Sequence, residues 1–345
     1  MQDTALITET TDNDDVMRRV LRAYAKHERD TELADEVEKL IKTSERAFFH
    51  GDPAIRIGRL AEGRILAVIG EPGAGKTRAL ERIFYQREEF WKIADIEDRT
   101  LISVKAPSPC TLKQLGNSLL KALGYPAVRD LKENIVWQMV RERLQTHGVR
   151  YVHIDELQHA VEYATDGELQ KVRNTLKALL QQSDWPVCLI LSGLPMLIPF
   201  IQGERQLKRR SRFVTFADMS LSTDRDDIHA MARGMIIGAG KLSARTIFND
   251  AFYARLLHAA EYQFGTMIEY VQDAIDEALD EGVTEITIDH FANVYEARSG
   301  CDSEFNVFTS VEWHKIDVAG ALRIAGSEET DDLEPIRKIR ERKNR

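Results

Sequence analysis

Residues 70–77 read Gly-Glu-Pro-Gly-Ala-Gly-Lys-Thr, which fits the pattern G-x-x-x-x-G-K-[ST] at every fixed position. The apolar run 65–69 precedes this stretch, and a helical pattern containing Leu80 and Ile83 follows it. A glycine-rich loop between a strand and a helix turns successive backbone N–H groups toward phosphate oxygens, at a helix end that carries partial positive charge. The stretch therefore predicts a P-loop that binds a nucleoside triphosphate.

Two side chains at the end of this loop have specific expected roles. Lys76 is expected to reach the β- and γ-phosphates, and Thr77 is expected to offer its hydroxyl to Mg²⁺. The predicted cofactors are therefore ATP and Mg²⁺. The predicted nucleotide-binding residues are Gly70, Pro72, Gly73, Ala74, Gly75, Lys76, Thr77 and Arg78.

A second acidic motif follows the apolar strand pattern 151–154, where the chain continues with Asp155 and Glu156. Beside a P-loop, Asp155 is expected to hold the Mg²⁺ shell and Glu156 to orient the attacking water, because phosphoryl transfer depends on positioning and charge neutralisation. An isolated Asp-Glu pair at a strand end would indicate a helix cap instead. Next to the complete P-loop we favour an ATPase in which Glu156 and Lys76 are catalytic.

The strand pattern 187–191 ends in Ser192 and Gly193. A polar residue at the tip of a strand beside the acidic pair is positioned to contact the γ-phosphate or the attacking water, so Ser192 is a candidate sensor. The alternative is a serine that only opens the turn into Gly193. His153, inside the strand before the acidic pair, is interpreted as a core histidine with satisfied hydrogen bonds.

A basic cluster lies just before the strand pattern 212–216. It is open to three interpretations: an exposed surface, a DNA contact, or an arginine finger that inserts into the site of a neighbouring subunit. Arginine suits a finger because its guanidinium is planar and permanently charged. Arg209 and Arg210 are the first candidates and Arg212 is the next, but the sequence does not choose among the cluster residues Arg205, Lys208, Arg209, Arg210 and Arg212.

The composition is that of an ordinary globular protein, with 345 residues, 43% hydrophobic and 30% charged. The net charge of -9 gives the chain no overall attraction to nucleic acid. No apolar run is long enough to cross a bilayer, and the polar, acidic N-terminus is unlike a secretory signal. Three scattered cysteines have no metal-site or disulfide spacing. We expect a cytoplasmic protein with no membrane partner.

Strand and helix patterns alternate from residue 65 to residue 216, and only helical patterns follow. Such alternation predicts an α/β fold with a central parallel sheet flanked by helices, followed by a small all-helical lid domain. The predicted segments are a disordered acidic N-terminus (1–14), N-terminal helices (15–50), a nucleotide-binding α/β domain (51–220), the helical lid (221–300), and a C-terminal extension with a charged tail (301–345).

These elements together resemble the AAA+ ATPases, and more narrowly the TniB/TnsC family of transposition regulators, over residues 15–300. The narrower resemblance is carried by four stretches of the sequence. These are Val104-Lys105-Ala106-Pro107-Ser108-Pro109 with the later Leu123-Gly124-Tyr125-Pro126, Asp155-Glu156-Leu157-Gln158-His159, Gln206-Leu207-Lys208-Arg209-Arg210, and Phe264-Gly265-Thr266-Met267-Ile268. Many AAA+ lids carry an arginine after this last glycine, but Thr266 follows here. The resemblance therefore implies slow, switch-like hydrolysis.

The resemblance also implies partners. ATP-bound subunits would form a homo-oligomer on double-stranded DNA, as a hexameric ring or a helical filament with six subunits per turn. This assembly would recruit a transposase together with a target-selection protein, and hydrolysis would disassemble it. The DNA contacts would be made to the backbone by residues of the helical region after the second strand, for which the candidates are Lys113, Lys121, Arg129 and Lys132. Ordinary solvated helix surface is the alternative interpretation for each of them.

Two other kinds of AAA+ protein remain as alternatives. An ExeA-like secretion or signalling ATPase would couple ATP to protein assembly without DNA, but the chain shows no membrane segment or peptidoglycan-binding extension. A replication initiator or helicase loader usually carries a winged-helix or other DNA-reading domain, and residues 300–345 are short for one. A metabolic kinase is least favoured, given Glu156 and the helical lid.

Overall fold

The computed structural model describes residues 3–49, 62–90, 100–126, 130–182 and 184–318. The chain divides into two compact units. The larger unit consists of Lys26–Asp218 with Gln263–Gly265, and the smaller unit consists of Met1–Ala25, Met219–Tyr262 and Thr266–Arg345.

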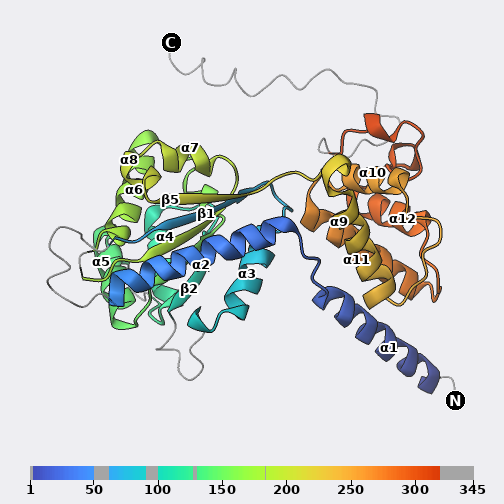
Figure 1. Ribbon diagram of the computed structural model, residues 1–345, viewed down its shortest axis with the longest axis horizontal. Coiled ribbons are helices and arrows are strands. Elements are labelled where there is room, and N and C mark those ends of the chain that lie inside the picture. The colour runs from blue at the N-terminus through green and yellow to red at the C-terminus, as the bar shows by residue number, and fades with distance from the viewer. Residues whose placement is uncertain (1–2, 50–61, 91–99, 127–129, 183, 319–345) are drawn as a thin grey trace, which may run out of the picture. The chain divides into compact units, whose positions relative to one another are not determined.

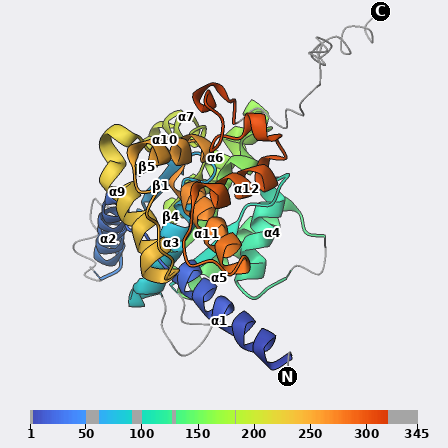
Figure 2. The ribbon, with the colours of Figure 1, turned by 90° about the vertical axis from the view of Figure 1, so that its right-hand side faces the viewer.

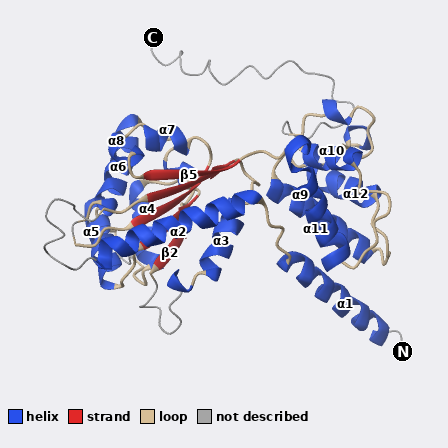
Figure 3. Ribbon diagram, viewed as in Figure 1, coloured by secondary structure: helices blue, strands red, loops and turns tan. Residues whose placement is uncertain are grey.

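A five-stranded sheet forms the centre of the larger unit (Figure 3). The strand order is β2-β3-β4-β1-β5, and every neighbouring pair is parallel. Because the strands are parallel, their carboxyl ends lie along one edge of the sheet. The strands are β1 (Ile65–Gly70), β2 (Leu101–Lys105), β3 (Tyr151–Asp155), β4 (Cys188–Gly193) and β5 (Ser211–Phe216).

Helices cover both faces of this sheet, so β1 is buried at every position (Figure 1). Ile65, Ala67 and Ile69 pack in the core beneath one set of helices, and the alternating Leu66 and Val68 pack beneath the other. The predicted α/β fold is confirmed. The second set is α2 (Glu28–Phe49) and α3 (Lys76–Gln86), and the first is α4 (Leu112–Ala122), α5 (Glu133–Thr146), α6 (Asp166–Leu180), α7 (Leu197–Gln202) and α8 (Arg205–Lys208).

Helices α4 and α5 form the inserted pair that was expected after the second strand. A capping box starts α4, in which the Thr111 side chain accepts from the Gln114 backbone and Gln114 reaches back to the Thr111 N–H. Trp137 on α5 donates its indole N–H to the Leu112 carbonyl at 3.1 Å. Gly116 lets the two helices approach closely, since a Cβ built on it would lie 2.6 Å from Val136 Cγ1.

The smaller unit is helical, as the sequence predicts. Phe252, Phe291 and Phe308 pack together in its interior, with the first two ring centroids 4.8 Å apart. The last two long helices lie side by side (Figure 2), and Arg298 bonds Asp273 across them. The elements are α1 (Asp3–Arg22), α9 (Leu221–Arg233), the π-helical turn η4 (Gly234–Ala239), α10 (Asp250–Ala259), α11 (Phe264–Asp280), and α12 (Ile288–Ser299).

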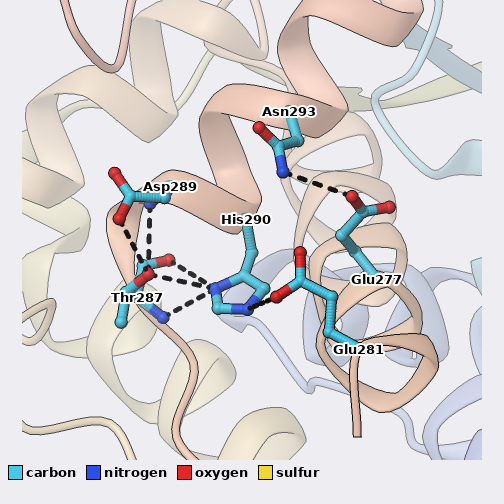
Figure 4. Close-up of polar contacts among 6 residues, drawn as sticks. All are labelled: Glu277, Glu281, Thr287, Asp289, His290 and Asn293. Carbon is cyan, nitrogen blue, oxygen red and sulfur yellow. Dashed lines mark hydrogen bonds and ion pairs between the residues drawn. The ribbon is translucent and has the colours of Figure 1, made fainter. Parts of the chain in front are cut away.

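Figure 4 shows how α12 starts in this unit. The Thr287 backbone N–H donates to Nδ1 of His290 at 3.0 Å, so the histidine completes the capping box. Nε2 of His290 then faces Glu281 at 3.4 Å, and Asn293 donates to Glu277 at 3.2 Å. These contacts fix the N-terminus of α12 against the end of α11.

The N-terminus differs from the sequence prediction. Residues 1–14 were expected to be disordered, whereas α1 begins at Asp3 and runs to Arg22. The sequence predicted a helix only from residue 15 on, so the difference is confined to the start of α1. Val16 and Val20 are buried, α1 packs on η4, and Asn13 donates to the Leu279 carbonyl, so tertiary contacts stabilise this helix. The predicted N-terminal segment is also divided, with α1 in the smaller unit and α2 in the larger. The limits proposed near residues 220 and 300 stay predictions.

We predict that Gly116→Ala destabilises the larger unit. The added methyl group overlaps the buried Val136, which costs about 1–3 kcal/mol and outweighs the roughly 0.5–1 kcal/mol that alanine gains in a helix. Gly167→Ala on α6 is the matched control, because a Cβ there meets nothing within 4 Å. Urea unfolding followed by circular dichroism measures both. A Gly116→Ala midpoint at or above that of Gly167→Ala would contradict the packing argument.

Candidate nucleotide site

The loop between β1 and α3 has the backbone of a phosphate cradle. Gly73 and Gly75 have φ of 75° and 91°, a left-handed conformation that glycine adopts without strain. A Cβ on Gly70 would lie 2.8 Å from the Phe216 carbonyl oxygen, so the start of the loop also excludes larger residues. The loop therefore has the shape that the sequence predicts.

Lys76 is buried at the first position of α3. Its ammonium donates to the carbonyl oxygens of Gly70 and Glu71, both at 2.8 Å, so it lies inside the curve of the loop. Burial lowers the pKa of Lys76, while Glu156, Asp155 and Glu71 act in the opposite direction. A buried ammonium favours a bound polyanion, because an opposite charge compensates for the water that burial removes.

Gly265 also belongs to this site, because its backbone lies against the P-loop. No role in the site was predicted for this glycine from the sequence. A Cβ built on Gly265 would lie 2.4 Å from the Gly73 carbonyl oxygen and 3.1 Å from the Gly75 nitrogen. The backbone at Gly265 therefore touches the loop, and any larger residue would displace it. Gly265 lies in a stretch that resembles a known family, but its contact with the loop was not predicted.

Thr77 and Asp155 come together as predicted, although they lie 78 positions apart. The Thr77 hydroxyl donates to Asp155 Oδ2 at 2.9 Å, at the carboxyl edge of the sheet. Burial would raise the pKa of Asp155, but hydrogen bonds from Ser192 and Thr77 hold that pKa below its ordinary value. An ionised carboxylate beside a hydroxyl offers the hard oxygen ligands that Mg²⁺ prefers, so the residues fit this ion.

Glu156 adopts a left-handed backbone with φ of 54°, which is uncommon for a residue with a side chain. Its carboxylate accepts a hydrogen bond from the amide of Gln158, and the Gln158 oxygen in turn faces the backbone N–H of Leu194 at 3.4 Å. Gln158 is buried and fixes the orientation of Glu156. Gln158 lies in a stretch that resembles a known family, but its hydrogen bond to Glu156 was not predicted from the sequence.

Ser192 lies at the tip of β4, but its hydroxyl is turned toward Asp155 Oδ1. His153 Nε2 lies 2.9 Å from the same Ser192 oxygen, and Ser103 Oγ lies 2.8 Å from His153 Nδ1. The interpretation of His153 as a core histidine with satisfied hydrogen bonds is therefore confirmed. Burial lowers its pKa to about 4, so the imidazole is neutral at pH 7.

Three residues of the basic cluster, Arg209, Arg210 and Arg212, line one side of a cavity of about 470 Å³ between α2 and the starts of β1 and β5. Arg210 is buried in its wall, where it donates to the Gln206 carbonyl and pairs with Glu62. This placement argues against Arg210 as a finger, because reaching a neighbouring subunit would break a buried ion pair. Arg209 and Arg212 also form ion pairs, with Glu62 at 3.6 Å and with Glu36 at 3.2 Å, but their side chains are 65% and 63% exposed, so they remain candidates.

The predicted DNA contacts lie on or beside the α4–α5 pair. Lys121 lies in the last turn of α4 and Lys132 precedes α5, and both are exposed. Lys113 is half-buried and pairs with Asp130. Arg129 lies outside the described residues. No helix in the described part of the chain is long and apolar enough to cross a membrane.

Comparisons with known proteins agree with this geometry. Residues 59–200 match the family model of an AAA domain. No curated protein matches the sequence. Three similar solved structures are the Aeropyrum pernix Orc1 protein in complex with DNA (14% identity, TM-score 0.55, covering 82% of this chain and 69% of that one), Cdc6p from Pyrobaculum aerophilum (11%, 0.54, 81% and 70%), and Drosophila ORC bound to DNA (14%, 0.51, 84% and 66%).

Identities this low establish similarity of fold alone. The sheet order, the glycine loop, the Thr77–Asp155 contact and the matched family model all agree. The chain has the AAA+ P-loop fold, and residues 59–200 match the family model of an AAA domain.

Proposed function

We propose that this chain is an ATP-dependent, DNA-binding AAA+ regulator of DNA transposition. In the ATP state it assembles on target duplex DNA and recruits a transposase, and hydrolysis disassembles the assembly. The observation that supports the ATPase part of the proposal is the contact between Thr77 and Asp155, with Glu156 next in the chain, because it unites a triphosphate loop with an acidic pair. The role in transposition is proposed from the resemblance to the TniB/TnsC family.

Hydrolysis follows from the groups at this edge of the sheet. Lys76 and the loop N–H groups hold the β- and γ-phosphates, and Glu156 orients and polarises the attacking water. Asp155 and Thr77 hold Mg²⁺, which neutralises charge on the phosphate oxygens when it is bound. Gln158 keeps the Glu156 carboxylate in place, since its amide donates to that carboxylate.

In this proposal the basic cluster is the subunit interface. Arg209 and Arg212 line the cavity with exposed side chains that pair with Glu62 and Glu36, whereas Arg210 is buried in the cavity wall. An exposed arginine of this kind reaches the γ-phosphate of a neighbouring subunit and makes the assembly depend on ATP. Such a contact joins different faces of two copies, which produces rings or helical filaments.

Contact with DNA is carried by exposed lysines of the α4–α5 pair. Because the chain has a net charge of -9, binding depends on a local basic surface repeated around the assembly. Lys121 and Lys132 fit phosphate contacts, which position a protein on DNA without reading its sequence.

A second candidate function is replication initiation. It is favoured by the likeness of fold to Orc1, Cdc6p and ORC, two of which were solved on DNA. The two functions differ in their DNA preference, because an initiator selects particular sites whereas the proposed regulator binds duplexes of any sequence. A binding competition between duplexes of random sequence and duplexes of one defined sequence distinguishes the two functions, because only an initiator would prefer a particular sequence.

Electron microscopy tests the assembly directly. We expect rings or filaments only when duplex DNA and a non-hydrolysable ATP analogue are both present, and single particles when either is omitted. Identical particles with and without DNA at low salt would exclude the proposed function.

Glu156→Gln should abolish turnover while preserving the bound state. Loss of the general base is expected to slow ATP hydrolysis by about 100-fold or more, because such groups contribute roughly 10²–10⁴-fold. Nucleotide affinity should stay within a few-fold of the parent, and assemblies should persist after ATP addition. Phosphate release and light scattering measure the two effects. Undiminished turnover would remove Glu156 from the catalytic role.

Lys121→Ala combined with Lys132→Ala should weaken DNA binding and reduce the slope of log affinity against log salt by about two. The matched control is Lys42→Ala with Lys171→Ala, which removes the same charge from exposed positions on α2 and α6. Fluorescence anisotropy at several salt concentrations measures both. Equal losses in the two double variants would mean that net charge, rather than this surface, governs DNA binding.

A further inference from the structure

Four polar side chains form a continuous line across the sheet and end at the proposed Mg²⁺ ligand. Ser103 on β2 lies directly opposite His153 on β3 in the strand register. His153 contacts Ser192 on β4, and Ser192 contacts Asp155 at the end of β3. All four belong to the larger unit. The line therefore joins an edge strand to the residue that we assign to the metal.

The direction of each hydrogen bond follows from the number of available protons. An ionised Asp155 only accepts, so the single hydroxyl proton of Ser192 points to Asp155 Oδ1. The Ser192 oxygen must then accept from His153, which places the imidazole proton on Nε2. Nδ1 of His153 is left as an acceptor, and it receives the Ser103 hydroxyl proton.

Burial holds this arrangement in place. His153 is 2% exposed and Ser192 is fully buried, so water does not compete for their bonds. The ring of Phe84 on α3 lies edge-on to the imidazole, with centroids 5.2 Å apart, and restricts its rotation. A neutral imidazole has one N–H that donates and one nitrogen that accepts, and in His153 both form hydrogen bonds.

We propose that His153 is a positioning residue for the metal site: its Nε2–H fixes Ser192, and Ser192 fixes Asp155 in the orientation that binds Mg²⁺. In this arrangement Ser192 donates its hydroxyl proton to Asp155 in a hydrogen bond. Ser192 therefore orients the metal ligand and has no proton left to donate to the γ-phosphate. The predicted role of Ser192 as a phosphate sensor is thereby replaced. Outer residues that orient a metal ligand typically change metal affinity by about 10–100-fold when they are lost.

The test compares two substitutions of similar size. His153→Leu removes both hydrogen bonds, and His153→Gln restores an N–H donor toward Ser192 and an acceptor toward Ser103. His159→Gln is the control, because His159 follows the acidic pair and takes no part in this line. Calorimetry with the analogue adenylyl imidodiphosphate, in excess Mg²⁺ and in excess EDTA, gives the factor by which Mg²⁺ strengthens nucleotide binding.

We expect His153→Leu to reduce this factor by about tenfold, with nucleotide binding in EDTA unchanged, and His153→Gln to recover it to within about threefold. His159→Gln should match the parent. An unchanged factor in a folded His153→Leu variant would overturn the proposal. Equal loss in the Leu and Gln variants would also overturn it, because packing and not the donated proton would then be responsible.

The proposal rests on the proposed nucleotide site, and a second measurement separates the two. Nitrogen-15 spectra of the ligand-free parent, labelled at histidine and assigned through His153→Gln, report which ring nitrogen carries the proton. We expect the proton on Nε2, and a proton on Nδ1 would overturn the proposal even where His153→Leu does not fold. Absence of nucleotide binding in the parent, with the proton on Nε2, would count against the proposed function alone.

Discussion

The hydrogen bond between Thr77 and Asp155 depends on the parallel alignment of β1, β4 and β3, and the proposed chemistry depends on that bond. Parallel strands bring their carboxyl ends to one edge, which places the glycine loop, the acidic pair and Ser192 together. Helices bury both faces of these strands, and this packing keeps the edge of the sheet rigid. A site assembled this way needs no specialised loop beyond the P-loop itself, because each group ends a strand or begins a helix.

Local sequence patterns predicted most of this fold. The continuous apolar runs of β1 and β4 and the glycine loop are strong signals, because burial on both faces and left-handed backbone leave few residue choices. The sequence predicts this helix from residue 15, whereas α1 begins at Asp3, and the early part is held by Asn13, whose partner Leu279 lies far away in the sequence. Tertiary contacts of this kind have no local signature.

The candidate site divides in the same way. Lys76, Thr77 and Asp155 belong to motifs with fixed spacing, and their placement agrees with the prediction. Gln158, Gly265 and the line from Ser103 to Asp155 depend on which residues become neighbours across the sheet or against the loop. The burial of Arg210 is a similar case, because its partner Glu62 lies 148 positions away. Sequence spacing alone could not rank it below Arg209.

The left-handed backbone of Glu156 has an evolutionary consequence. A residue with a side chain in this conformation costs of order 1–3 kcal/mol, whereas glycine would adopt it freely. Under the proposed function, in which Glu156 orients the attacking water, selection for a stable fold and selection for hydrolysis oppose each other at this position. Lineages that no longer need turnover would be expected to drift toward glycine or asparagine at position 156. A glutamate at this position would then distinguish chains that still hydrolyse ATP from chains that only bind it.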